Sequence, residues 1–198
     1  MIIKVVLFSI LAYFMGSINS SIIICKFKNV DIKKVGSGNA GATNTVRALG
    51  KKYGVIVFLC DFFKGVIPCL IAKVSGVGEF VSIIGLFAVI GHNYPVYFGF
   101  KGGKGVSTTF GVVSCINLYV GLILGILVLV LIKTLKIVSI SVLITFVIFP
   151  FLMFFLNQYN TYVNCIISIL YTLLIFYTHR ENINRLINGT ENSFKSNK

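Results

Sequence analysis

The sequence contains few charged residues and very few acidic ones. Only 5 of the 198 residues are Asp or Glu, and all charged residues together make up 12% of the chain, against 57% hydrophobic residues. The mean hydropathy is +0.95. A soluble domain typically carries about 25% charged residues. The composition therefore excludes a soluble globular protein and predicts one integral membrane domain over residues 1–198.

Metal, redox and nucleotide motifs are also missing. The five cysteines occur singly, with no CxxC or Cys/His pairing, and no pair of carboxylates accompanies the polar loops. We therefore expect neither a metal site nor a cofactor. The pattern GxxxxGK[ST] is absent because Gly105 follows Lys104, which excludes a P-loop nucleotide triphosphatase.

The net charge of +13 arises from 18 basic residues, most of them in short connections between apolar runs. Membrane topology and anionic lipid explain basic residues in such places. We therefore expect a membrane lipid partner and no nucleic-acid binding.

Apolar runs long enough to cross a bilayer cover most of the chain. A membrane helix needs about 20 consecutive apolar residues. Clear runs occupy residues 2–25, 53–73, 81–98, 137–156 and 161–178. No Ala-x-Ala-like cleavage pattern follows the first run, which predicts a retained helix rather than a signal peptide. Residues 106–132 are ambiguous, being long for one span and short for two.

Loop charges predict the topology. Residues 26–52 carry seven basic residues against Asp31 alone, which places this loop in the cytoplasm and the N-terminus outside. Residues 157–160 are uncharged. A single crossing by residues 106–132 would put the basic connection at Lys133 and Lys136 outside. A break near Asn117 to Gly121 keeps it inside, so we predict about seven membrane segments, some of them short, with the C-terminus in the cytoplasm.

Three polar segments rich in glycine and basic residues interrupt the apolar runs. The first motif, residues 36–54, reads GSGNAGATNTVRALGKKYG. The second, residues 91–111, reads GHNYPVYFGFKGGKGVSTTFG, and the third, residues 179–191, reads HRENINRLINGTE. Together they contain both histidines and all three arginines. The pattern predicts a membrane scaffold with one composite polar site built from three cytoplasmic loops.

The first two motifs carry residue types that bind phosphate. Arg47 offers a planar fork suited to a phosphate dianion. Short hydrogen-bonding side chains precede it at Ser37, Asn39, Thr43 and Asn44. In the second motif, Lys104 lies among glycines whose N–H groups can approach an anion, at Gly102, Gly103 and Gly105. A helix is expected to begin just after them, where its N-terminus also favours an anion.

The third motif begins where the last apolar run ends. His179, Asn182 and Leu186 follow helical spacing and are expected to share one face. A histidine at a membrane border is more often structural, but near two anion-binding loops it becomes a catalytic candidate.

Two charged residues lie inside the second apolar run. Asp61 and Lys64 lie three positions apart (i, i+3) on one helix face, roughly 12–16 Å from the Tyr53 end. Charges at that depth normally pair toward the protein interior. Two interpretations remain open: a purely structural pair, or a brace beneath the active site.

The three motifs resemble those of a known family in order and spacing. Residues 37–47 fit SGNxGATNxxR, residues 91–106 fit GHxxPVxxxFKGGKGV, and residues 179–191 fit HRxNIxRLxxGTE. The chain resembles, over essentially its whole length, the bacterial acyl-phosphate:glycerol-3-phosphate acyltransferase family. It departs from the usual family residues at Asn19 and Ala40, which replace prolines, and at Ser107, which replaces an alanine.

The resemblance implies an all-α, polytopic helical bundle in the bacterial plasma membrane with a cytoplasmic active-site pocket. It implies direct transfer of a fatty acyl group from acyl-phosphate to glycerol 3-phosphate, giving 1-acylglycerol 3-phosphate and phosphate, without a cofactor. An enzyme that forms acyl-phosphate would then be a functional partner.

On this basis we assign phosphate binding to Ser37, Arg47, Lys104 and Asn182. His179 is the candidate for orienting or deprotonating the attacking hydroxyl, although the phosphate of the substrate could itself serve as the base.

Two other classes of function are weighed against the enzyme. A transporter of phosphate or phosphate esters would also suit basic loops at one face. It predicts a continuous polar path, whereas residues 137–156 and 161–178 are nearly free of charge and no inverted repeat is visible. A non-catalytic lipid-binding scaffold would not need Arg47, Lys104 and His179 in separate loops.

Overall fold

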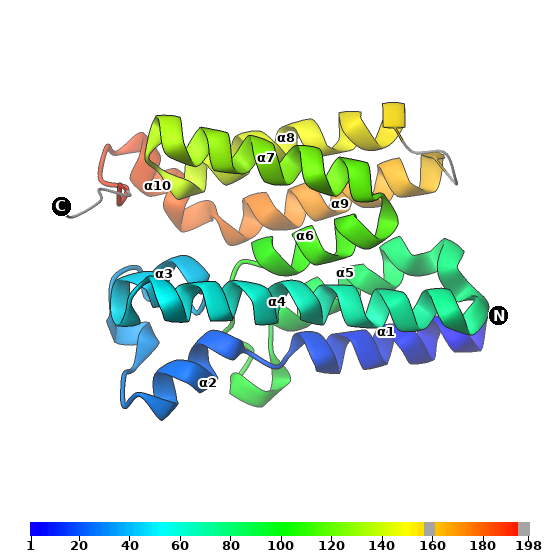
Figure 1. Ribbon diagram of the computed structural model, residues 1–198, viewed down its shortest axis with the longest axis horizontal. Helices are drawn as coiled ribbons and strands as arrows, with labels where there is room; N and C mark the ends of the chain where they lie inside the picture. Colours follow the sequence, from blue (N-terminus) through cyan, green and yellow to red (C-terminus); the bar gives the residue numbers. More distant parts are fainter. Residues whose placement is uncertain (157–160, 194–198) are drawn as a thin grey trace. The chain divides into compact units, whose positions relative to one another are not determined.

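The computed structural model describes residues 1–156 and 161–193, and within these residues the secondary structure is helical with no strand. The chain forms two compact units, Met1–Ile116 and Asn117–Lys198 (Figure 1). The predicted all-α membrane fold is confirmed. A single domain over residues 1–198 stays a prediction, since the two units are compact by themselves.

The first unit contains six α-helices and several short helical turns among its described residues. The α-helices are α1 (Ile2–Gly16), α2 (Ser20–Phe27), α3 (Ala42–Leu49), α4 (Lys51–Ala72), α5 (Val81–Asn93) and α6 (Val106–Ile116). The shorter turns are η1 (Ile32–Lys34), η2 (Lys73–Val77), η3 (Gly78–Phe80) and η4 (Val96–Phe98). Helix α4 packs against α1, α3, α5 and α6, so it is the axis of this unit.

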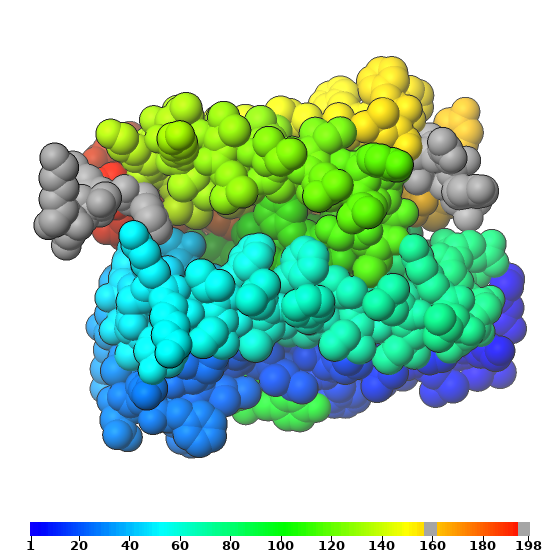
Figure 2. All heavy atoms as spheres, viewed as in Figure 1, coloured from blue at the N-terminus to red at the C-terminus, as the bar shows by residue number. Residues whose placement is uncertain are grey.

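The second unit contains α7 (Leu118–Leu135), α8 (Val138–Leu156), α9 (Thr161–Thr178) and α10 (Arg180–Ile187). Helix α8 packs against α7 and α9, and the rings of Phe146, Phe149 and Tyr171 form edge-to-face contacts in its buried core. The outward side of α7 carries exposed apolar side chains such as Leu122, Ile126 and Leu129, and Figure 2 shows this face uncovered. Such a face suits lipid.

The predicted break in residues 106–132 is confirmed. Helix α6 ends at Ile116 and α7 begins at Leu118. Asn117 between them has extended backbone (φ −148°, ψ 110°), and its side chain accepts a hydrogen bond from the N–H of Val120 at 3.1 Å. An asparagine at this position caps the new helix and so favours a break over one long span.

Length and composition identify four candidate membrane spans among the described residues, or five if α9 and α10 form one bent span. One of them, Lys51–Phe98, contains both α4 and α5, which are separated by the left-handed Gly76 (φ 77°). Helix α6, at 11 residues, is shorter than a span. The count of seven membrane segments therefore stays a prediction.

Two predicted runs differ from the helices observed. The run at residues 2–25 is broken after Gly16, and the run at residues 81–98 ends as an α-helix at Asn93. In the second case Tyr94 precedes Pro95 and has non-helical backbone (φ −126°, ψ 65°). The proline ring disfavours helical geometry in the residue before it, which hydrophobicity alone does not register.

Glycines bring the helix backbones of the first unit into direct contact. A Cβ on Gly65 of α4 would overlap the carbonyl oxygen of Thr108, and one on Gly111 of α6 would overlap that of Phe62. Small residues at such crossings allow the close approach by which membrane helices gain packing energy. The start of α6, and with it the second motif, is thereby fixed against the middle of α4.

Candidate active site

The first motif is a loop shaped by a buried asparagine. Asn44, 1% exposed, lies in α3 and accepts a hydrogen bond from the N–H of Ser37 at 3.0 Å. Its amide donates to the carbonyls of Ile32 at 3.1 Å and Val35 at 2.8 Å. The amide of Asn44 is thus engaged by the loop, so its first role is to shape the main chain around Ser37. Its contact with substrate stays a prediction.

Arg47 lies in the last turn of α3 with its side chain exposed. A Cβ on Gly36 would lie 3.2 Å from Cδ of Arg47 and would overlap Oδ1 of Asn44. The stem of Arg47 therefore crosses the loop main chain while the guanidinium remains exposed. Ser37, Asn39 and Thr43 are half-buried along the same loop and helix start. These four predicted residues therefore lie close together in residues 37–47, and none of them is fully buried.

The glycine loop of the second motif folds back on the end of α5. The N–H of Gly102 donates to the carbonyl of Asn93, and that of Gly103 to the carbonyl of His92, both at 3.1 Å. These two N–H groups therefore hold the loop against the end of α5. Their contact with phosphate stays a prediction. Gly105 has φ +79°, a left-handed geometry that glycine adopts without strain.

The remaining anion-binding features of the second motif lie at the start of α6. The hydroxyl and N–H of Thr109 both bond to the carbonyl of Gly105 at 2.8 Å, which begins the helix. The N–H groups of the first turn of an α-helix have no intrahelical acceptor. Lys104 is half-buried next to this turn, whereas Lys101 is exposed. The predicted helix start after the glycines is confirmed.

The first and second motifs meet directly. A Cβ on Gly103 would lie 2.7 Å from the carbonyl oxygen of Ala40 and would overlap the ring of His92. The same Ala40 carbonyl accepts a hydrogen bond from the amide of Asn19 at 3.4 Å. Asn19 and Ala40 both stand where the resembled family usually has proline, and here the two positions are joined by a hydrogen bond instead.

The third motif lies in the second unit and begins at a bend. The helix axis turns by 60° between α9 and α10, with His179 at the corner. His179 is 3% exposed, and its Nδ1 lies 2.8 Å from the carbonyl of Ile175. A carbonyl only accepts, so Nδ1 carries the proton, and in a neutral ring Nε2 is then the proton-accepting nitrogen. This tautomer suits a general base.

Asn182 is held by Glu191, a carboxylate that is not among the predicted site residues. Glu191 accepts hydrogen bonds from Asn182 at 2.6 Å, from Nε of Arg185 at 2.7 Å and from Ser139 at 3.0 Å. Burial raises the pKa of Glu191, but these three hydrogen bonds and the charge of Arg185 outweigh it and hold the pKa below its ordinary value. Glu191 therefore remains ionised and fixes the amide of Asn182.

Sequence signals for this network were weak. Glu191 is the last residue of the third motif, and the sequence alone does not indicate which residues its carboxylate contacts. Ser139 lies in α8, 52 residues before Glu191. Contacts of this range depend on tertiary packing.

Comparisons with known proteins agree with the motif resemblance. Residues 6–189 match the family model described as glycerol-3-phosphate acyltransferase. The chain is 48% identical over 193 residues to the glycerol-3-phosphate acyltransferase of Aquifex aeolicus, covering 96% of this chain and 100% of that protein. It is 41% identical over 188 residues to glycerol-3-phosphate acyltransferase 2 of Thermotoga maritima, covering 93% and 94%.

Two solved structures have the same fold. Crystal structures of PlsY (YgiH), an integral membrane glycerol 3-phosphate acyltransferase, are 43% identical to this chain and cover 97% of it and 96% of their own length. The TM-score is 0.91 for the glycerol 3-phosphate form and 0.88 for the lysophosphatidic acid form. The chain therefore belongs to the glycerol-3-phosphate acyltransferase family and is a multi-pass membrane acyltransferase.

Proposed function

We propose that this enzyme transfers a fatty acyl group from acyl-phosphate to the sn-1 hydroxyl of glycerol 3-phosphate. The products are 1-acylglycerol 3-phosphate and inorganic phosphate, a step of phospholipid synthesis. The observation that carries the proposal is the contact between the first and second motifs at Ala40 and Gly103, which joins the segment that contains Arg47 to the loop that contains Lys104. Both proposed substrates end in a phosphate dianion.

The reaction follows from the chemistry of the donor. The glycerol hydroxyl attacks the carbonyl carbon of the mixed anhydride, the new ester bond forms, and the carbonyl–phosphate bond breaks to release phosphate. Because this anhydride is already activated, the enzyme has mainly to position the reactants and stabilise developing charge. No acyl-enzyme intermediate is needed.

The roles of the residues follow from their surroundings. Arg47 and Lys104 bind phosphate oxygens together with the glycine loop at Gly102, Gly103 and Gly105. Because the N–H groups of Gly102 and Gly103 also bond to the end of α5, the first-turn N–H groups of α6 supply further donors. Ser37, Asn39 and Thr43 have short polar side chains that supply hydrogen bonds to the substrate. In the second unit, Nε2 of His179 accepts the hydroxyl proton, and Asn182, held by Glu191, binds phosphate.

We place the enzyme in the bacterial cell membrane with its N-terminus outside and the three motifs in the cytoplasm. This orientation is supported by the basic residues at positions 26–52. The soluble substrate, glycerol 3-phosphate, then reaches the motifs from the cytoplasm. An enzyme that forms acyl-phosphate would supply the donor.

An assay of purified protein in detergent tests the proposal. Acyl-phosphate and glycerol 3-phosphate are supplied singly and together, and released phosphate and acylated product are measured, with an acyl-coenzyme A thioester as an alternative donor. We expect stoichiometric phosphate and product only when both substrates are present. A transporter or a lipid-binding scaffold would give neither, and activity with the thioester alone would contradict the assignment of the donor.

A further inference from the structure

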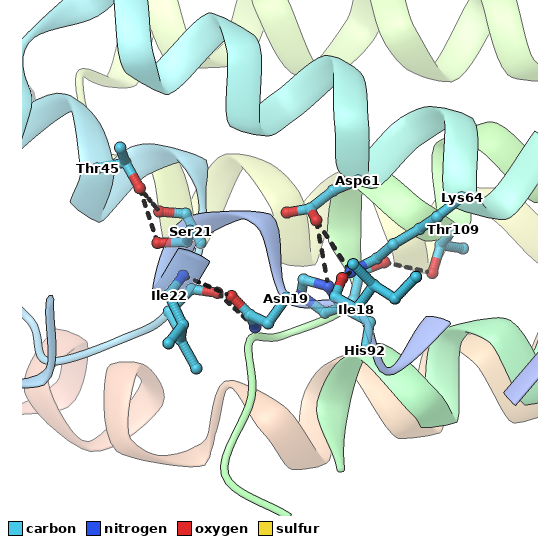
Figure 3. A network of polar contacts seen from close by, with 12 residues as sticks. Ile18, Asn19, Ser21, Ile22, Thr45, Asp61, Lys64, His92 and Thr109 are labelled. Atoms are coloured by element: carbon cyan, nitrogen blue, oxygen red, sulfur yellow. Dashed lines mark hydrogen bonds and ion pairs between the residues drawn. The ribbon is translucent and has the colours of Figure 1, made fainter. Parts of the chain in front are cut away.

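A buried group of ionisable side chains lies at the middle of α4. Asp61 and Lys64 are 1% and 7% exposed, and their Oδ1 and Nζ atoms lie 2.9 Å apart. Nδ1 of His92, from α5, lies 3.7 Å from the same Asp61 oxygen (Figure 3). None of the three side chains is part of the substrate-binding set proposed above. Burying such groups in a membrane protein is costly, so their position calls for a function.

Lys64 connects this cluster to the break between α1 and α2. Its ammonium donates to the carbonyl of Ile18 at 2.8 Å. The carbonyls at the end of α1 have no intrahelical donor, and irregular backbone at membrane depth must be satisfied by protein. The adjoining residue, Asn19, caps α2 and donates to the carbonyl of Ala40 in the first motif. Two hydrogen bonds, from Lys64 to Ile18 and from Asn19 to Ala40, therefore connect the cluster to the first motif.

His92 connects the cluster to the second motif. Its carbonyl accepts the N–H of Gly103, and its ring fills the space where a side chain at position 103 would lie. The ring itself is 4% exposed, between α4 and the glycine loop. The contacts of His92 with Asp61 and with Gly103 thus connect the cluster to the loop that contains Lys104.

We propose that Asp61, Lys64 and His92 form a positioning unit that sets the first motif against the second. The unit fixes the helix break behind Ala40 and the glycine loop in front of it, and so holds Arg47 and Lys104 at the separation that the substrates require. This inference rests on the proposed function for its catalytic consequence. It decides between the two interpretations left open by the sequence, in favour of a brace beneath the active site.

The test separates positioning from stability by removing both charges together. Asp61→Leu/Lys64→Met leaves no uncompensated charge, and buried ion pairs replaced by apolar residues of similar size commonly retain stability. We expect the variant to fold and to unfold at a somewhat lower temperature than the wild type, because the carbonyl of Ile18 loses its donor. We also expect kcat/KM to fall at least tenfold, with kcat reduced and not only KM raised. Lys73→Met is the control, because Lys73 also donates to a carbonyl, that of Cys115, but lies directly after the C-terminal end of α4.

A structural readout makes the inference independent of the reaction. Spin labels at positions 34 and 101, in a cysteine-free background, report the separation of the segment just before the first motif from the glycine loop of the second motif. We expect one narrow distance distribution in the wild type and in Lys73→Met, and a broadened one in the double variant. This result would stand even if the acyl-phosphate assay failed, so the two proposals are tested separately.

An unchanged distance distribution or unchanged kcat/KM in a folded double variant would overturn the inference. If the apolar double variant does not fold, Asp61→Asn/Lys64→Gln is measured in the same way. It keeps two polar side chains of similar size. Because glutamine is one bond shorter than lysine, we expect it to lose the hydrogen bond to the carbonyl of Ile18. Wild-type distances and activity in that variant would equally contradict a positioning role.

Discussion

At the scale of single residues, two lysines of the second motif have different surroundings. Lys101 is exposed and follows Phe100, whereas Lys104 is half-buried between two glycines at the start of α6. Both carry the same charge and both flank Gly102-Gly103. We therefore expect burial, rather than charge, to distinguish the proposed substrate contact of Lys104 from a contact of Lys101 with lipid headgroups.

We predict that Lys104→Ala nearly abolishes acyl transfer, whereas Lys101→Ala loses much less, mainly through weaker association with the donor or the membrane. Each variant loses one charge from the same loop, so the pair is internally controlled. Initial rates at several concentrations of each substrate measure the difference. Equal losses would mean that the loop acts only as a diffuse positive field.

Arg47 is the second residue whose chemistry can be tested by a conservative change. Arg47→Lys keeps the charge but replaces the planar fork by a single ammonium. We predict a decrease of at least about tenfold in kcat/KM, which corresponds to about 1.4 kcal/mol of transition-state binding. Steady-state kinetics on folded protein check this, and wild-type values would remove Arg47 from the site.

At the scale of elements, the glycine loop 102–105 is defined by close packing. We predict that Gly103→Ala displaces this loop, because the added methyl group would overlap the His92 ring and crowd the Ala40 carbonyl. Activity should be almost lost. Gly125→Ala in α7 is the control, since a Cβ there meets nothing within 4 Å. Phosphate release by both variants, with thermal unfolding as a check on folding, measures the effect.

The segment from α10 to Glu191 gives a prediction on pH. The pKa of Glu191 is lower when folded than its ordinary value of about 4.5. Its ionised form therefore contributes stability above that value, and the contribution is lost as the pH falls through the lower folded pKa. We predict that Glu191→Gln lowers the unfolding temperature at neutral pH and that the difference from the wild type narrows below about pH 4. Thermal unfolding across this pH range tests it, and a constant difference would contradict the assignment.

At the scale of the whole molecule, topology is the property to test. Cysteines introduced at Lys34, Lys101, Lys133 and Ser193 should react with an impermeant reagent from the cytoplasmic side, and one at Asn160 from the outside. The first four positions are exposed, whereas Asn160 lies outside the described residues. Labelling in intact cells and in inverted vesicles measures the sides. Reaction of position 193 from outside would contradict the seven-segment prediction.

Local properties of the sequence determined the class of the molecule. Apolar length predicted membrane helices, because hydrophobicity is a property of neighbouring residues in the chain. The run at residues 106–132 was correctly divided near Asn117 from the charges of the loops, and the local reason for the break is capping by Asn117. The three motifs also sufficed to identify the family, since each is a contiguous stretch of residues. The ends of helices were predicted less well: α5 stops at Asn93, ahead of Pro95, and the first run is broken at residues 17–19.

Tertiary structure decided which polar groups face one another. The amide of Asn44 is engaged by Ile32, Val35 and Ser37, and the N–H groups of Gly102 and Gly103 bond to the end of α5. Asn182 is held by Glu191. Asp61 and Lys64 could be paired from their spacing, but their links to His92 and Ile18 could not. A hydrogen bond requires two groups within about 3 Å in a fixed direction, and for residues 30 to 50 positions apart only the packing of the helices provides that.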